Sequence, residues 1–285
     1  MATFFGEVLS VFSRAVDDEE EDDKEEEDEE DREIKRELEK KREVTLTWSP
    51  ETSAAIEDSP EHRLSCSSLI LAVGDNATGF VSSHILSSGS WEVSGHITLW
   101  NERCREHAPR SDTTPSSCVF YRCITDPTVI LCQCFCYVAE DQQFQWCEKV
   151  LGCLQKDNLK VTILSTCPVS DYKTPESTYN LPVPFLKVLK TKHYTNGTPC
   201  GPLEQPNIAD GLPAAVMAHC QVWRIPAIYY QCYTDITKLD SVTMEAFRSV
   251  LSCQSMSLLA AKSENILETL RNSMRTTEVQ SNLYI

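Results

Sequence analysis

The sequence predicts an α/β fold with a mostly parallel or mixed central sheet sandwiched by helices, and two observations predict it. Strand-like segments alternate with helical patterns along residues 44–275. Residues 129–138 are almost continuously apolar, which is typical of a central strand buried on both faces. Glu140 and Asp141 then begin a helix with one apolar face that can cover the sheet. That face is expected to carry Phe144, Cys147, Val150, Leu151 and Leu154.

The other elements follow in chain order from the same two periodicities. Apolar runs predict strands at 44–48, 69–73, 91–100, 118–124, 160–167 and 225–233. Helical spacing predicts an exposed helix at 32–43, one around 80–85, one from Pro213 to Trp223 and one at 263–275. Asp240 or Ser241 caps a further helix. Its inner face is expected to carry Val242, Ala246, Phe247, Val250 and Leu251.

Residues 168–206 contain seven prolines and are predicted to form one long irregular loop. Loops of this length are usually functional or mobile. Three aromatic residues, Tyr172, Phe185 and Tyr194, lie within it. They suit either a contact with another protein or packing of the loop onto its own domain.

Charge divides the chain into three parts. Residues 17–31 comprise 14 acidic residues and one lysine, so most of the formal net charge of −17 lies near the beginning of the chain. We therefore predict an acidic, largely disordered leader at 1–43, a single α/β domain at 44–275 and a flexible tail at 276–285. The leader is either a solvated spacer or a surface for a basic protein. Nucleic acid is excluded as a partner because its phosphates would be repelled.

The 14 cysteines lie mostly in apolar segments of a large domain, which favours reduced, buried thiols over disulfides. No CxxC spacing occurs, so the usual zinc-binding pattern is missing. Cys132, Cys134 and Cys136 alternate, which would place them on one face of a strand, roughly 6.6 Å apart. We expect them to be small core residues, with no metal site and no cofactor.

Gly74-Asp75-Asn76 joins a predicted strand to a predicted helix, as the phosphate-binding turn of nucleotide folds does. The turn lacks both GxGxxG and GxxxxGK, and Asp75 would repel a phosphate, so an ordinary βα turn is the favoured interpretation. The alternative is a nucleoside phosphorylase or hydrolase-like enzyme. The chain has no GxSxG or HExxH motif, and His219 and Cys220 are adjacent on a helix and point in different directions. The sequence thus predicts no catalytic residues and no enzyme.

The last residues form a candidate docking tail. Ten mostly polar residues follow the predicted 263–275 helix, and they could reach about 33 Å when extended. Leu283 can fill an apolar hole, Tyr284 offers an aromatic face with a hydroxyl, and the carboxylate of Ile285 can pair with a lysine. Leu283, Tyr284 and Ile285 are therefore the predicted partner-binding residues, and a frayed terminus is the alternative.

The beginning of the chain lacks the basic region of a signal peptide, and no window reaches the roughly 18 apolar residues that a membrane span requires. We expect a cytoplasmic protein without a membrane span, with the nucleus or association with the endoplasmic reticulum as alternatives. The sequons at Asn76 and Asn196 are accordingly expected to be unused.

Several separated blocks carry a resemblance to a known family. They include Cys118-Val-Phe-Tyr121, Cys136-Tyr-Val-Ala-Glu-Asp-Gln-Gln143, Leu203-Glu-Gln-Pro-Asn-Ile208, Cys220-Gln-Val-Trp223 and Cys232-Tyr-Thr-Asp235. With these blocks, nearly the whole chain resembles the proteasome assembly chaperones. Departures from the family pattern concentrate at 9–35, 50–65, 104–117 and 190–202, which are leader and loop regions.

The resemblance implies a three-layer α/β/α fold related to phosphorylase-like proteins, without known catalysis. It also implies a heterodimer with proteasome assembly chaperone 2. That heterodimer promotes formation of the α-ring of the 20S proteasome and prevents premature ring dimerisation. A tail of the form hydrophobic-Tyr-X docks between α subunits in this family, and Leu283, Tyr284 and Ile285 match it.

Overall fold

The computed structural model describes residues 29–103, 118–175, 181–236, 238–257 and 259, and the chain divides into two units, 1–41 and 42–285. The described part of the first unit is helix α2 (Glu29–Lys41), which has no buried residue. Its first turn is acidic and its last turn basic, an order that favours a helix through its dipole. The predicted exposed helix at 32–43 is therefore confirmed. Residues 1–28 of the leader and the tail 276–285 lie outside the described residues.

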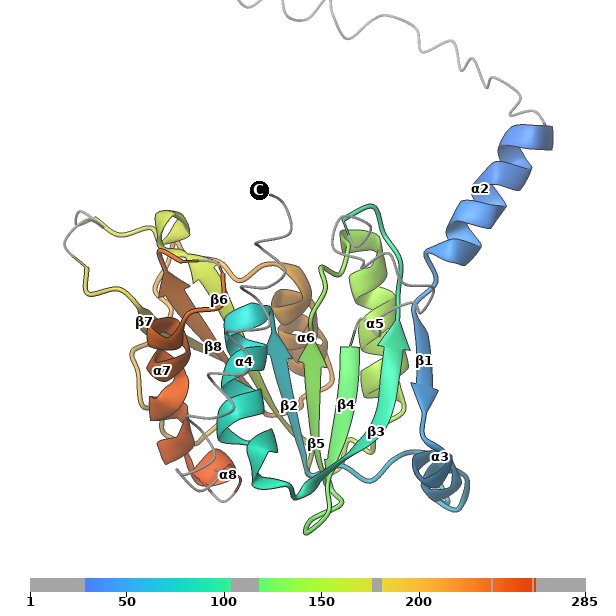
Figure 1. The fold of residues 1–285 in the computed structure, drawn as a ribbon, viewed down its shortest axis with the longest axis horizontal. Coiled ribbons are helices and arrows are strands. Elements are labelled where there is room, and N and C mark those ends of the chain that lie inside the picture. Colours follow the sequence, from blue (N-terminus) through green and yellow to red (C-terminus); the bar gives the residue numbers. More distant parts are fainter. Residues whose placement is uncertain (1–28, 104–117, 176–180, 237, 258, 260–285) are drawn as a thin grey trace, which may run out of the picture. The chain divides into compact units, whose positions relative to one another are not determined.

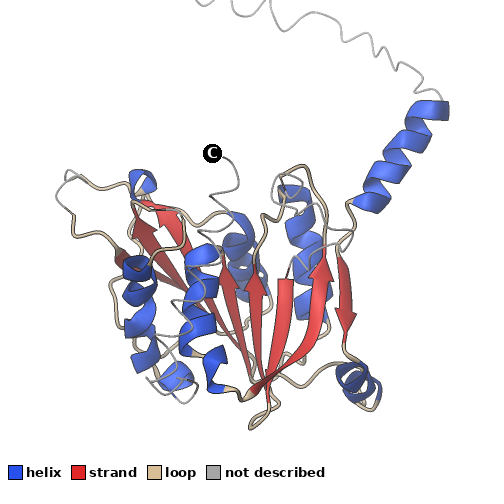
Figure 2. Ribbon diagram, viewed as in Figure 1, coloured by secondary structure: helices blue, strands red, loops and turns tan. Residues whose placement is uncertain are grey.

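The second unit is built on one eight-stranded sheet, shown in Figures 1 and 2. Its strands are β1 (Thr45–Trp48), β2 (Ser68–Val73), β3 (Trp91–Thr98), β4 (Cys118–Cys123), β5 (Val129–Cys134), β6 (Lys160–Pro168), β7 (Phe185–Lys190) and β8 (Ala227–Thr234). They lie in the order β1-β3-β4-β5-β2-β6-β8-β7. Strands β5, β2, β6 and β8 run parallel, whereas β1, β3, β4 and β7 pair with their neighbours in antiparallel fashion. The predicted mixed sheet is confirmed.

Helices cover both faces of this sheet (Figure 1). The covering helices are α4 (Asp75–His84), α5 (Glu140–Gly152), α6 (Gly211–Val222), α7 (Ser241–Ala246) and α8 (Gln254–Ser257). Helix α3 (Pro50–Glu57) lies at the end of edge strand β1 (Figure 1), and 3-10 turns lie at Leu86–Ser88, Val169–Asp171 and Phe247–Ser252. Residues of α5 and α6 share one hydrophobic cluster with the sheet, and residues of α4 and α7 share another. Two separate cores define a three-layer α/β/α sandwich.

Strand β2 shows how the sheet serves both cores. Leu69 and Leu71 belong to the cluster beneath α5 and α6, whereas Ile70 and Ala72 belong to the opposite cluster. Because side chains alternate along a strand, a strand buried on both faces must be apolar at every position. All six residues of β5 and all eight of β8 are buried as well.

The central strand is shorter than predicted. Strand β5 ends at Cys134 rather than at 138, and Phe135 is already 50% exposed. Its neighbour β2 ends level with it, because Val73 pairs with Cys134 and Gly74 then turns the chain into α4. Cys136 therefore lies in the loop after β5, so the prediction of three cysteines on one strand face is wrong.

Helix α5 forms as predicted, but Phe144 does not face the core. It is 71% exposed, whereas Trp146, two residues later, is completely buried. Two residues correspond to about 200° around a helix, so only one of them can face the sheet. The larger indole takes that position.

Val242, which was predicted to face inward, and Trp223, the last residue of the predicted 213–223 helix, are both exposed. Val242 lies in the first turn of α7 and is 61% exposed. The α-helix changes to a 3-10 turn at Phe247, so the residues predicted on one face, from Val242 to Leu251, do not keep α-helical spacing throughout. Trp223, at 53% exposed, follows the last residue of α6, and the Lys156 ammonium lies 3.1 Å from the centre of its ring. The predicted helix at 263–275 lies outside the described residues.

The prediction of one irregular loop at 168–206 is wrong, because the segment contains edge strand β7. The outer edge of β7 is partly covered: the Val188 amide donates to Gly201, and the Val188 carbonyl accepts from Leu203. Two of the three aromatic residues pack on the domain, since the rings of Tyr172 and Phe185 lie 4.8 and 5.3 Å from that of Tyr233.

Tyr194, the third, packs against the core beneath α4 and α7. The described residues thus support the packing interpretation of this segment.

Among all the residues that the structure describes, no helix combines the length and apolarity that crossing a membrane requires.

Candidate functional site

The predicted partner-binding residues Leu283, Tyr284 and Ile285 lie outside the described residues. Their docking role therefore stays a prediction. The described domain contains four other candidate sites: the glycine turn, the His219-Cys220 pair, a polar cavity and a cluster of thiols.

The glycine turn lies at the carboxyl end of β2, the edge of a parallel sheet where ligands commonly bind. Gly74 has φ of +85°, a conformation that glycine adopts without strain. Its amide, however, donates to the carbonyl of Cys134 at 3.1 Å, which leaves that amide unavailable to a phosphate. The hydroxyl of Thr78 donates back to the Gly74 carbonyl at 2.9 Å.

The fully buried Asn76 uses both ends of its carboxamide within the protein. Its nitrogen donates to the carbonyl of Lys238 at 3.0 Å, and its oxygen accepts from the amide of Asp240 at 2.7 Å. These bonds hold α4 to the segment that leads into α7. The Gly74 amide and the Asn76 side chain thus have structural partners, which favours an ordinary βα turn over a phosphate site.

His219 and Cys220 do not form a catalytic pair. Cys220 is completely buried, and burial raises the pKa of its thiol to about 12, so it stays protonated at neutral pH. The His219 ring lies beside Trp223 instead, with Nδ1 3.9 Å from a carboxylate oxygen of Glu148. Core packing explains the Cys220 side chain.

A polar cavity of about 340 Å³ lies at the carboxyl ends of β6 and β8. Cys167, Asp171, Asp210, Gln231 and Tyr233 are among its lining residues. Burial raises the pKa of the Cys167 thiol to about 11, which disfavours the nucleophilic thiolate. The cavity thus holds carboxylates and an amide but no activated nucleophile among the described residues.

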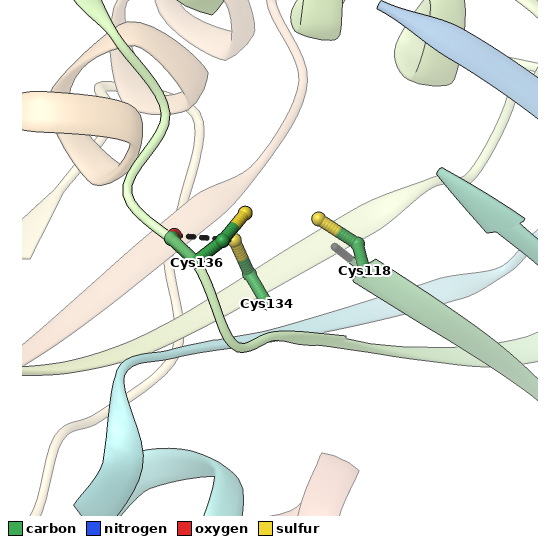
Figure 3. Close-up of side chains that lie close together, drawn as sticks. All are labelled: Cys118, Cys134 and Cys136. Carbon is green, nitrogen blue, oxygen red and sulfur yellow. Dashed lines mark hydrogen bonds between the residues drawn. The ribbon is translucent and has the colours of Figure 1, made fainter. Parts of the chain in front are cut away.

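Three thiols converge beside β5, as Figure 3 shows. The sulfur atoms of Cys118, Cys134 and Cys136 all lie within 4.8 Å of one another. Cys118 is the first residue of β4 and pairs directly with Cys134, the last residue of β5. Cys136 lies in the loop that follows, and its carbonyl accepts a hydrogen bond from the Cys134 thiol at 3.4 Å. We call these three residues the thiol cluster.

The environment of the thiol cluster is apolar. Cys118 and Cys134 are fully buried in the core beneath α5 and α6, whereas Cys136 is half-buried against it. The neighbouring thiol of Cys132, together with that of Cys136 and burial, raises the pKa of Cys118 well above its ordinary value. The neighbouring thiol of Cys118 and burial do the same for Cys134. In the metal-free protein both thiols are therefore protonated at neutral pH.

Sequence reasoning placed Cys134 and Cys136 together but did not include Cys118. The signal was present in the dipeptide Asp126-Pro127, which favours a turn between the segments predicted as strands at 118–124 and 129–138. In a hairpin centred on Asp126, Cys118 and Cys134 are each eight residues from the centre, and the structure pairs them.

Comparison with known proteins gives the family. A family model described as proteasome assembly chaperone 4 matches residues 1–285. The protein named proteasome assembly chaperone 1 in Xenopus tropicalis is 70% identical over 287 residues, covering 100% of both chains. The human protein of the same name is 48% identical over 286 residues, covering 99% of both.

Solved structures show the same fold. Pyrococcus furiosus PbaB, described as an archaeal proteasome activator, aligns with a TM-score of 0.53 at 10% identity, over 86% of this chain and 100% of that chain. A Thermoplasma acidophilum protein of unknown function aligns with a TM-score of 0.54 at 11% identity, over 85% and 99%. At such low identities the likeness concerns the fold alone. The full-length relatives and the family model establish that the chain belongs to the family of proteasome assembly chaperones.

Proposed function

We propose that the protein chaperones assembly of the 20S proteasome as a heterodimer with proteasome assembly chaperone 2. In this proposal the heterodimer binds α subunits, promotes formation of the α-ring and prevents its premature or off-pathway dimerisation. The observation that carries the proposal is the match, over the whole chain, to relatives named proteasome assembly chaperone 1.

Such a chaperone acts by binding alone. A ligand stabilises only the state that it binds better, so a chaperone that fits correctly placed α subunits favours the correct ring over other assemblies. Release follows when maturation changes the face to which it is bound. No bond is made or broken, and no cofactor is required.

The tail would provide the second contact. Leu283 would enter an apolar hole between two α subunits, with the Tyr284 ring packed beside it and the carboxylate of Ile285 paired with a lysine. The ten residues from 276 to 285 would give the contact a reach of about 33 Å.

Affinity purification of the tagged full-length chain from cells, followed by mass spectrometry, tests both parts. Wild-type protein should recover proteasome assembly chaperone 2 and α subunits, with few β subunits. Tyr284→Ala, and deletion of residues 283–285, should lose α subunits while keeping the sister chaperone. Ser281→Ala, a change at a neighbouring tail position, should behave as wild type.

Two results would contradict the proposal. Undiminished recovery of α subunits by the Tyr284→Ala variant would remove the tail from the mechanism and leave the chaperone role intact. Absence of both the sister chaperone and α subunits from the wild-type sample would overturn the assembly role.

We also propose that the protein is cytoplasmic, with the nucleus or association with the endoplasmic reticulum as the alternatives. Fractionation of the same cells tests this placement.

The protein is a chaperone and not an enzyme. The family is one of chaperones, so this protein acts as a chaperone rather than as a nucleoside phosphorylase or hydrolase. The glycine turn agrees with this conclusion, because Gly74 and Asn76 use their polar groups to join secondary-structure elements.

A further inference from the structure

The spacing of the thiol cluster is close to that of a metal site. An ion about 2.3 Å from three sulfur atoms in one plane holds those atoms about 4 Å apart. The sulfur atoms of Cys118, Cys134 and Cys136 lie within 4.8 Å of one another. A contraction of less than about 1 Å would thus bring all three to bonding distance of a single ion.

The origins of the three side chains allow that contraction. Cys118 and Cys134 lie on paired strands in a packed core, so their positions are set by the sheet. Cys136 follows the end of β5 and is only half-buried, so small changes in its loop can move the third sulfur. Because Cys136 is only half-buried, an ion can reach the cluster from solvent on the side of Cys136.

The ligand set selects the kind of ion. Sulfur donors are soft and favour Cu(I) and zinc over magnesium, calcium or manganese. A structural zinc site takes four ligands, usually cysteine and histidine. In the part of the chain that the structure describes, no fourth Cys, His, Asp or Glu lies within 4.8 Å of all three thiols. Cu(I), a monovalent d10 ion, is stable with three sulfur ligands and needs no fourth.

We propose that Cys118, Cys134 and Cys136 form a binding site for one Cu(I) ion with three sulfur ligands. The ion would connect β4 to the loop that links β5 with α5. It would bind the folded protein, in which the three sulfurs are gathered, more tightly than the unfolded chain. Loading would therefore raise the stability of the domain.

Binding would also release protons. A thiol must lose its proton to become a strong metal ligand, so the apparent affinity should rise with pH. No electron transfer occurs, because copper enters and leaves as Cu(I).

The test uses the purified full-length protein, reduced and kept without oxygen. Cu(I) is added in the presence of bathocuproine disulfonate, a Cu(I) chelator that leaves only tight protein sites loaded. Wild-type protein should retain one copper per chain. X-ray absorption should show three sulfur neighbours, with no nitrogen or oxygen.

Three substitutions identify the site. Cys136→Ser should lower the Cu(I) affinity at least tenfold, and it is the decisive variant because its half-buried position puts folding least at risk. Cys118→Ser should have the same effect where circular dichroism shows that the variant folds. Cys220→Ser is the matched control, because Cys220 is a buried thiol of the same core that lies outside the cluster, and it should bind copper as wild type does.

Retention of one copper per chain by Cys136→Ser would overturn the proposal, as would a nitrogen or oxygen ligand in the absorption spectrum. A parallel titration with Zn(II) against a zinc chelator tests the coordination number. Zinc bound as tightly as Cu(I), and lost in Cys136→Ser, would overturn the assignment of a three-coordinate site.

Discussion

The carboxamide oxygen of Asn76 accepts a 2.7 Å hydrogen bond from the backbone amide of Asp240, 164 residues later in the chain. The same carboxamide donates to the Lys238 carbonyl, so one buried side chain satisfies two backbone groups of the segment before α7. Asp240 in turn caps α7 by accepting from the Thr243 amide. A chain of polar contacts thus connects α4 with α7 in the same layer.

Replacing Asn76 by alanine should therefore destabilise the domain. The substitution removes the two partly buried hydrogen bonds to the Asp240 amide and the Lys238 carbonyl, and each lost hydrogen bond costs about 0.5–1.5 kcal/mol. Urea denaturation should show a lower free energy of unfolding. Asn196→Ala, at an exposed position, is the control and should change it by less than about 0.5 kcal/mol. Equal stabilities of the two variants would contradict the structural role of Asn76.

Trp146 and Phe144 offer a contrast on one helix. Trp146 is completely buried, so Trp146→Ala should lower the free energy of unfolding by about 3–5 kcal/mol, through lost burial and the cavity left behind. Phe144 is mostly exposed, and Phe144→Ala should stay within about 0.5 kcal/mol of wild type. Thermal or chemical denaturation distinguishes them, and the reverse order would favour the orientation predicted from the sequence.

The buried His84 should make stability depend on pH. Burial lowers the pKa of its imidazole below the ordinary value, Arg248 adds to this effect, and the Phe80 carbonyl and then Glu245 oppose it. The unfolded chain thus binds the proton more readily, and the stabilising contribution is complete above about pH 6.5. It should be lost as the pH falls from there through the lower pKa of the folded state.

The free energy of unfolding should accordingly decrease between about pH 7.5 and pH 5.5. The decrease should be smaller in His84→Gln, which cannot take up the proton, than in His193→Gln, a change at an exposed histidine. Identical pH profiles for these two variants would show that His84 does not contribute.

Arg42 should control the acidity of Asp141. Its guanidinium donates two hydrogen bonds to Asp141, at 2.8 and 2.9 Å, and contacts Glu102 on its other side. Hydrogen bonding to Arg42 is the main cause that lowers the pKa of the Asp141 carboxyl. Arg42→Gln should raise that pKa toward its ordinary value, as measured by NMR titration.

The contribution of this pair to stability is present above about pH 3.9 and is lost as the pH falls through the lower pKa of the folded state. Lys149→Gln removes a different surface pair, with Glu43, and should leave the titration of Asp141 unchanged. An equal shift of Asp141 in both variants would indicate a general effect of charge rather than the contact with Arg42.

The parallel core of the fold was predictable because each of its strands is recognisable from a short run of consecutive residues. Runs such as Leu69-Ile-Leu-Ala-Val73 and Val129-Ile-Leu-Cys132 are apolar at every position, as a strand between two helical layers must be. The Glu140 helix start and the Asp240 cap were equally readable, since a cap depends on residues a few positions apart.

Elements that depend on distant partners were not predictable in the same way. Strand β7 lies among prolines and becomes a strand only because β8 offers it a free edge. The choice between Phe144 and Trp146 is likewise made by the shape of the core. The thiol cluster required the register of β4 on β5, and the residues of the predicted tail lie outside the described part of the chain.

The edges of the sheet have a consequence for solubility. At one end the edge strand β1 has four residues, and at the other β7 follows Pro184, carries Lys187 and Lys190, and is partly covered by residues 201–203. Short, charged or covered edges give a foreign strand little backbone with which to pair. The sheet is thereby protected from pairing edge to edge with the sheets of other copies of the same chain.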